Sequence, residues 1–112
     1  VSNFENGTLQ NAEFRPHTKT KQTKNNITEP VDPIWGKNDN ISIVITPLLA
    51  FDPQGYRVGY GKGFYDRFFA SLHKDVKRIG ISFFKPCKSI ENINEYDIPL
   101  THCVTPDKTY SF

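Results

Sequence analysis

Apolar residues follow two different spacings in the middle of the chain, and these predict a strand, a helix and a second strand. Residues 41–45, Ile-Ser-Ile-Val-Ile, form a short β-branched run that is typical of a buried strand. Phe64, Phe68 and Leu72 recur every four residues, which predicts an amphipathic helix. Residues 79–84 predict the second strand. Two strands joined in this way are expected to be parallel, with a right-handed crossover.

The segments on either side carry weaker signals. Asn6-Gly7 lies between two short stretches that each hold an apolar residue, which predicts a hairpin within the first 14 residues. Residues 15–26 are polar and basic with almost no apolar periodicity, so we expect a surface loop there. Residues 101–105 are a candidate for a last short strand.

The composition limits what kind of protein this chain can be. With 112 residues, it is expected to form a single α/β domain over residues 1–112. Hydrophobic residues make up 37% and the mean hydropathy is −0.53, which is polar for a self-sufficient domain. A net charge of +2 argues against a general nucleic-acid binder, which would carry a basic face.

Targeting signals are missing from the sequence. No apolar run approaches the roughly 18 residues that would span a bilayer, and the first residues lack the features of a secretory signal. We therefore expect a cytoplasmic protein with no membrane partner. In such a chain Cys87 and Cys103 are expected to be reduced thiols rather than a disulfide.

Residues 57–67, Arg-Val-Gly-Tyr-Gly-Lys-Gly-Phe-Tyr-Asp-Arg, carry the clearest candidate chemistry. Without Cβ atoms, Gly59, Gly61 and Gly63 can adopt positive φ and bring main-chain N–H groups close to an anion. The start of the predicted helix adds free donors and partial positive charge. Lys62 stands where its ammonium could reach the same anion, so the segment indicates a phosphate site.

A turn without a ligand is the alternative, because glycine-rich turns between a strand and a helix are common. The segment fits neither standard phosphate motif: a Walker loop would follow Lys62 with Ser or Thr, and the dinucleotide motif would place glycine at Phe64. Asp66 likewise has two interpretations, since an acid in the first helical turn is stabilised by the helix dipole. The residues alone leave both interpretations open.

Residues 47–52, Pro-Leu-Leu-Ala-Phe-Asp, and residues 55–67 together closely resemble the signature of the 5-formyltetrahydrofolate cyclo-ligase family, also called methenyltetrahydrofolate synthetase. The resemblance covers most of residues 24–107, whereas residues 1–23 match weakly. Other pieces that agree are Ile27-Thr28-Glu29-Pro30 with the family's Glu-Pro segment, residues 79–83 with its next strand, and Asn94-Glu95-Tyr96-Asp97 with its late acidic motif.

This resemblance implies a three-layer α/β sandwich with a mostly parallel, Rossmann-like sheet, and an ATP- and Mg²⁺-dependent ligase that forms a C–N bond. Members of the family convert 5-formyltetrahydrofolate to 5,10-methenyltetrahydrofolate and release ADP and phosphate. ATP would phosphorylate the formyl oxygen, N10 of the folate would attack the activated carbon, and phosphate would leave. Phosphoryl transfer needs positioning and charge neutralisation rather than a protein nucleophile, which explains why no catalytic Ser, Cys or His stands out.

By position, the resemblance also assigns site residues. Arg57 and Lys62 would be catalytic, Arg57 as a fork on phosphate oxygens and Lys62 as a stabiliser of transition-state charge. Asp66 and Asp97 would hold magnesium, which usually accepts two carboxylates plus substrate phosphates. The ATP-binding residues would be Arg57, Val58, Gly59, Tyr60, Gly61, Lys62, Gly63, Phe64 and Tyr65. The folate would contact Tyr60, Gly61, Lys62, Gly63 and Phe64.

The chain departs from the family in three places. Lys62 is glycine in many relatives, and Phe64 replaces a frequent tyrosine. The family's early basic helix has no counterpart before Val1, so we expect the C-terminal portion of a cyclo-ligase with at most weak activity alone. Its sheet is expected to expose an apolar face that self-association, a partner or the N-terminal part would cover.

Two other classes of function stay open. One is a non-catalytic nucleotide- or folate-binding module derived from the enzyme, which would bind ATP without producing ADP. The other is a structural α/β domain whose glycines serve only the turn.

Overall fold

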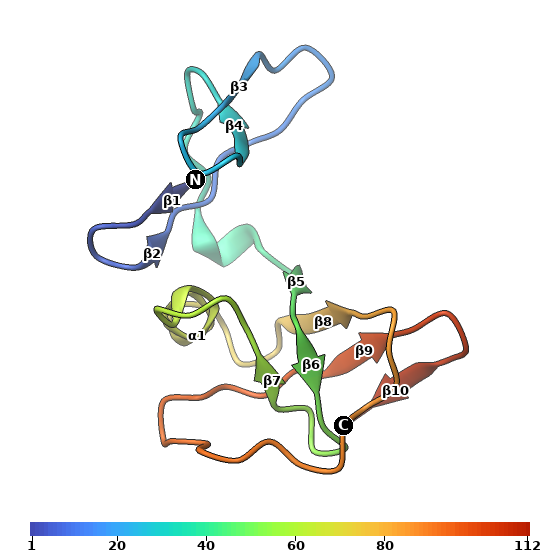
Figure 1. Ribbon diagram of the computed structural model, residues 1–112. Helices are drawn as coiled ribbons and strands as arrows, with labels where there is room; N and C mark the ends of the chain where they lie inside the picture. The colour runs from blue at the N-terminus through green and yellow to red at the C-terminus, as the bar shows by residue number, and fades with distance from the viewer.

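The computed structural model describes all 112 residues, and its centre is a mixed four-stranded sheet in the order β10–β9–β8–β5 (Figure 1). The strands β5 (Ile43–Pro47), β8 (Lys77–Ile81) and β9 (His102–Val104) run parallel, and β10 (Thr109–Ser111) is antiparallel to β9. The predicted parallel pair is therefore confirmed, with shifted bounds. β5 continues through Pro47 because it is an edge strand, where a missing N–H is tolerated.

A single α-helix, α1 (Phe64–Ala70), follows the glycine-rich segment as predicted and packs on one face of the sheet. The first core cluster, which includes Phe69 from the helix and Val44 from β5, lies between them. A second cluster of Phe51, Leu100 and Cys103 lies towards β9 and β10. A Cβ atom added at Gly80 would meet the side chains of Leu48, Leu100 and Cys103, so these side chains pack directly against the backbone of β8.

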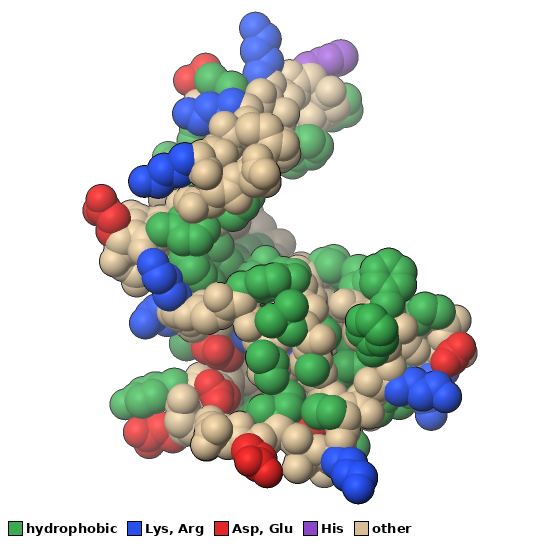
Figure 2. All heavy atoms as spheres, in the orientation of Figure 1, with side chains coloured by type: hydrophobic (Ala, Val, Ile, Leu, Met, Phe, Trp, Pro, Cys, Tyr) green, Lys and Arg blue, Asp and Glu red, His purple; other side chains and the backbone are tan.

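The other face of the sheet has no helix on it. Ile43, Ile45, Ile81 and Val104 are exposed, and the strand register places them on the same face. Figure 2 shows hydrophobic side chains gathered on the surface of the body that holds the sheet. The α/β class is thus confirmed, but these residues supply one helical layer rather than the two of a three-layer sandwich, because α1 is the only α-helix.

Between β5 and α1 the chain forms a small hairpin that the apolar pattern did not predict. The strands β6 (Ala50–Phe51) and β7 (Arg57–Val58) pair antiparallel around the turn at residues 52–55. This hairpin delivers residues 59–63, here named the glycine loop, to the start of α1. Gly61, Lys62 and Gly63 all have positive φ, at 96°, 61° and 64°.

Residues before β5 form two further hairpins that stand apart from the sheet in Figure 1. The first, β1 (Ser2–Asn3) with β2 (Thr8–Leu9), closes at Asn6-Gly7 as predicted. The second pairs β3 (Thr20–Gln22) with β4 (Thr28–Pro30), and a short 3-10 helix η1 (Asn38–Asn40) follows.

The interpretation of residues 15–26 as a loop is corrected by β3. This strand is exposed along its whole length, and the turn after it closes through Asn26, which has a φ of 60°. Its residues, Thr-Lys-Gln, show no apolar alternation, because neither face of the hairpin is buried.

Both cysteines are free thiols, Cys87 exposed and Cys103 buried in β9. Burial raises the pKa of the Cys103 thiol to about 11. No helix of the structure combines the length and the apolar character needed to cross a bilayer.

Candidate functional site

The glycine loop presents main-chain donors that the protein does not use. None of the N–H groups of residues 59–63 donates a hydrogen bond to another protein group. A Cβ atom added at Gly59 or at Gly61 would meet nothing within 4 Å. The loop is therefore open, and its donors are available to an anion.

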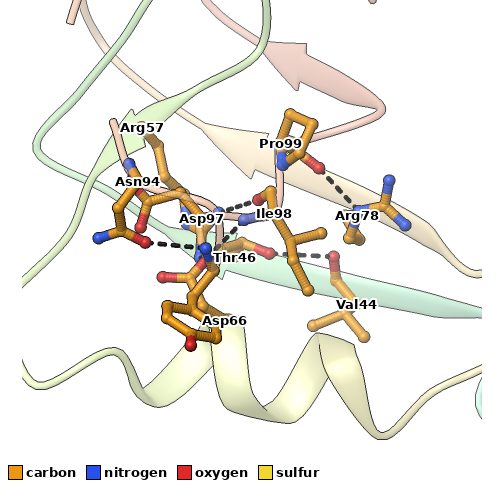
Figure 3. Close-up of polar contacts among 10 residues, drawn as sticks. Val44, Thr46, Arg57, Asp66, Arg78, Asn94, Asp97, Ile98 and Pro99 are labelled. Atoms are coloured by element: carbon orange, nitrogen blue, oxygen red, sulfur yellow. Dashed lines mark hydrogen bonds and ion pairs between the residues drawn. The ribbon is translucent and has the colours of Figure 1, made fainter. Parts of the chain in front are cut away.

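Arg57, at the start of β7, is buried beside this loop, with its side chain 6% exposed. Its Nη1 donates to the carbonyl oxygen of Ile98 at 2.7 Å and its Nη2 to Oδ1 of Asp66 at 3.0 Å, as Figure 3 shows. The guanidinium also lies over the ring of Phe69, 4.9 Å from its centroid. The two guanidinium nitrogens that were predicted to bind phosphate therefore both donate to protein groups. These contacts indicate that Arg57 positions the site.

The two predicted metal ligands come together through the segment that precedes Ile98. Oδ1 of Asp66 accepts the N–H of Ile98 at 3.0 Å, and Ile98 directly follows Asp97. Oδ2 of Asp97 accepts the N–H of Asn94 at 3.0 Å, which closes a tight turn. Each carboxylate thus uses one oxygen to hold the structure, while Asp66 Oδ2 and Asp97 Oδ1 accept no hydrogen bond from the protein.

Asp66 and Asp97 line one cavity of about 460 Å³ next to the glycine loop. Oxygen donors of this kind suit magnesium, which usually takes one or two carboxylates and completes its shell with water and phosphate. No third His, Cys, Asp or Glu joins them in a cluster. The residues that line the cavity are Gly63, Asp66, Arg67, Ala70, Asn94, Tyr96 and Asp97.

Lys62 extends towards the N-terminal hairpin rather than over the loop. Its Nζ donates to the carbonyl oxygen of Phe4 at 2.9 Å and lies 5.8 Å from the centroid of the Phe4 ring. Tyr60, two residues earlier, is 72% exposed. A role of Lys62 in charge stabilisation stays a prediction, and it requires the ammonium to leave the Phe4 carbonyl.

Phe64 and Tyr65 pack against protein. The ring of Phe64 meets that of Phe4 edge-on, with centroids 5.1 Å apart. Tyr65 packs with Phe69 in the core cluster, with centroids 6.0 Å apart. Burial raises the pKa of the Tyr65 hydroxyl, and the nearby charge of Arg57 partly opposes this. Neither ring points freely towards a ligand, so contacts with ATP or folate stay predictions for both.

The sequence motifs missed two arginines that shape the site. Arg67 Nη1 donates to the carbonyl oxygens of Lys62 and, at 3.1 Å, of Gly7. Arg78 Nε donates to the carbonyl oxygen of Pro99 at 2.8 Å. Burial, and secondly the charge of Arg57, lowers the pKa of Arg78. Arg78 follows Lys77 at the start of β8, where the sequence gives no signal that separates it from an ordinary surface charge, and Arg67 has no such signal either.

Comparisons with known proteins point to one family. The sequence profile of the 5-formyltetrahydrofolate cyclo-ligase family matches residues 1–106, which includes residues 1–23, where the motifs gave only a weak resemblance. The 5-formyltetrahydrofolate cyclo-ligase of Escherichia coli K12 is 32% identical over 117 residues, covering 97% of this chain and 62% of that protein. The enzyme of Haemophilus influenzae is 36% identical over 93 residues, covering 78% of this chain and 48% of that protein.

A solved structure supports the fold. The NMR structure of Aquifex aeolicus 5,10-methenyltetrahydrofolate synthetase superposes with a TM-score of 0.76 at 24% identity, covering 97% of this chain and 55% of that chain. The chain thus spans about half to three fifths of the length of the relatives it matches. With a profile match over nearly its whole length, the chain belongs to the 5-formyltetrahydrofolate cyclo-ligase family.

Proposed function

We propose that this chain carries the nucleotide- and magnesium-binding part of a 5-formyltetrahydrofolate cyclo-ligase, and that its function is the ATP-dependent formation of 5,10-methenyltetrahydrofolate with release of ADP and phosphate. One observation carries the proposal: the unused main-chain donors of the glycine loop lie beside a cavity lined by Asp66 and Asp97. The exposed apolar face of the sheet is suited to a second helical layer, which favours the three-layer family fold for the whole enzyme.

The glycine loop would bind the triphosphate of ATP. Its N–H groups donate to nothing in the protein, and the open space at Gly59 and Gly61 lets a phosphate approach the backbone. Val58, which precedes the loop, and the side chain of Tyr60 within it would bound the nucleotide. Lys62 would supply a positive charge to the phosphates after leaving Phe4.

Asp66 and Asp97 would hold magnesium through the carboxylate oxygens that have no protein donor. When bound, the cation would neutralise charge on the phosphates during phosphoryl transfer. Arg57 would keep Asp66 oriented and hold the segment of Ile98 against α1. This role accounts for its burial better than a direct fork on phosphate does.

The folate would lie against the loop on the side of Tyr60. This ring is exposed and could stack on a pterin ring, while Gly61 and Gly63 permit close approach. Phe64, which packs on Phe4, would complete the folate contact at the end of the loop. Phosphorylation of the formyl oxygen would then require only that the two substrates are held side by side.

Titration calorimetry with ATP and Mg²⁺ tests the binding site. We expect Asp66→Asn and Asp97→Asn each to weaken Mg-ATP binding by about tenfold, or about 1.4 kcal/mol. The matched control is Asp107→Asn, because Asp107 is an exposed acid in the β9–β10 turn. Mutants that bind as well as the control would refute the metal assignment.

An activity assay separates the enzyme from the alternative classes. The chain would be mixed with ATP, Mg²⁺ and 5-formyltetrahydrofolate while methenyl absorbance and ADP are followed. Product formation that stops in Asp66→Asn supports the cyclo-ligase. Nucleotide binding without any ADP, at protein concentrations where even weak turnover is measurable, would instead indicate a non-catalytic module, and the absence of binding would indicate a structural domain.

A further inference from the structure

We infer that Arg67 and the β1–β2 hairpin position the glycine loop for nucleotide binding, so that Arg67 is a positioning residue for the site. This inference rests on the proposed function, which it extends to residues outside the glycine loop and the two predicted metal ligands. Figure 1 shows the β1–β2 hairpin lying next to α1, although the two are far apart in sequence. Arg67 of the helix and Phe4 of the hairpin both contact Lys62.

Lys62 needs such support because of its backbone. It has a φ of 61°, a region that residues with a Cβ atom rarely adopt, and it lies between two glycines that also have positive φ. A strained conformation of this kind persists only where surrounding structure fixes it. In this loop, the neighbours on both sides are glycines, which impose no restriction of their own.

Arg67 fixes this residue from the helix side. Its Nη1 donates to the carbonyl oxygen of Lys62 and, at 3.1 Å, to that of Gly7, so one nitrogen joins the glycine loop to the hairpin. The N–H of Arg67 also donates to the carbonyl oxygen of Gly63 at 3.1 Å. The carbonyl oxygens of Lys62 and Gly63 thus both accept hydrogen bonds from Arg67. The N–H groups of the loop stay free for a ligand.

The hairpin fixes Lys62 from the other side. The carbonyl oxygen of Phe4 accepts from Lys62 Nζ at 2.9 Å, and the Phe4 ring packs on Phe64. Gly7 is the only buried residue before Val44, so the hairpin is buried only where it meets the loop. A hairpin that served only to cover the sheet would bury apolar side chains instead.

Gly7 shows how closely the parts fit. A Cβ atom there would lie 2.5 Å from Arg67 Nη1 and 3.0 Å from the carbonyl oxygen of Lys62. The arginine can move aside, but only by giving up its contacts with both carbonyls. Gly7→Ala should therefore release the loop as Arg67→Ala does, through a change made outside both the loop and the helix.

The experiment combines NMR relaxation with Mg-ATP titration for the wild type, Arg67→Ala, Gly7→Ala and the control Arg15→Ala. Arg15 is an exposed arginine whose side chain pairs with Glu13, away from the loop. We expect amide order parameters at residues 60–63 to fall from about 0.85 to below about 0.6 in both test variants, and to stay unchanged in the control. The dissociation constant should rise about tenfold, as expected if one tenth of the molecules keep a binding-competent loop.

Amide spectra of β5, β8 and β9 report whether each variant keeps its fold, so loss of the fold is distinguishable from release of the loop. The inference would be overturned if the β1–β2 hairpin detaches from the loop in Arg67→Ala while the order parameters at residues 60–63 stay at the wild-type value. So would an unchanged dissociation constant in a variant with a mobile loop. If the wild type binds no nucleotide, the proposed function fails, while the order parameters still decide whether Arg67 holds the loop.

Discussion

Two turns flank β7, and they differ in whether their main-chain N–H groups have an acceptor within the protein. In the turn at residues 52–55, the carboxylate of Asp52 accepts from the N–H groups of Gln54 and Tyr56, both at 3.0 Å, and of Ile90 at 3.1 Å. Asp52 itself is 1% exposed. In the glycine loop on the other side of β7, the N–H groups have no protein acceptor.

Their glycines differ in the same way. A Cβ atom at Gly55 would lie 2.8 Å from the carbonyl oxygen of Leu100 and 2.9 Å from the Phe112 ring, whereas one at Gly59 or Gly61 would meet nothing within 4 Å. The first turn contains its own anion, and its residues Asp52 and Gly55 are buried. The second has donors but no anion, and space in front of them. Fixed donors without an internal acceptor are what distinguishes a ligand loop from a structural turn.

The largest effect is expected from Asp52→Ala. Loss of the carboxylate removes the acceptor of three N–H groups in a closed turn, which should lower the free energy of unfolding by about 3 kcal/mol. Urea denaturation measures this, with the exposed Asp107→Ala as the control. A loss no larger than that of the control would show that the turn does not depend on its anion.

Gly55→Ala should cost about 2 kcal/mol of unfolding free energy. Its φ is 88°, and the added methyl would push against a main-chain oxygen that cannot move without the β9 region. The carbonyl oxygen of Gly55 also accepts the N–H of Leu100, at 2.8 Å. Thermal unfolding is the measurement, and the same substitution at Gly59 is the control. Equal melting temperatures for the two variants would contradict the contrast between packed and open glycines.

Much of the fold could be predicted from local patterns. The β-branched run predicted β5, the four-residue spacing predicted α1, and Asn6-Gly7 predicted the first hairpin. In contrast, β3, β6 and β10 are two or three residues long, and their pairing depends on neighbours rather than on their own periodicity. Strands of this length carry too few side chains to show an alternation.

The site could be predicted only in part, for a similar reason. The glycines form one local motif, so the sequence alone suggested them as a phosphate site. Asp66 fits the helix dipole equally well by itself, and it became a predicted metal ligand through the family resemblance. Asp97 entered through the family resemblance, because its approach to Asp66 depends on a hydrogen bond between residues 32 positions apart. The partners of Arg57 and Arg67 also lie in distant segments, and no pattern of spacing records that kind of contact.

Gly61→Ala should separate binding from stability. Its φ of 96° makes alanine strained, at a cost of about 1 kcal/mol in unfolding free energy, but no protein atom opposes the methyl. We expect affinity for Mg-ATP to fall about tenfold, because the methyl would occupy the space in front of the donors. Calorimetry and urea denaturation of the same sample measure the two effects. A large loss of stability with unchanged affinity would make this loop resemble the turn at Asp52.

Gly59→Ala is expected to have the smallest effect, and it isolates the ligand most cleanly. Gly59 does not have positive φ, and its Cβ direction is open, so the free energy of unfolding should change by less than about 0.5 kcal/mol. A fall of about threefold in affinity for Mg-ATP, some 0.7 kcal/mol, would then come from the methyl meeting the phosphate. Because the protein has no reason of its own for glycine at this position, an unchanged affinity would mean that the phosphate approaches the loop only beyond Tyr60.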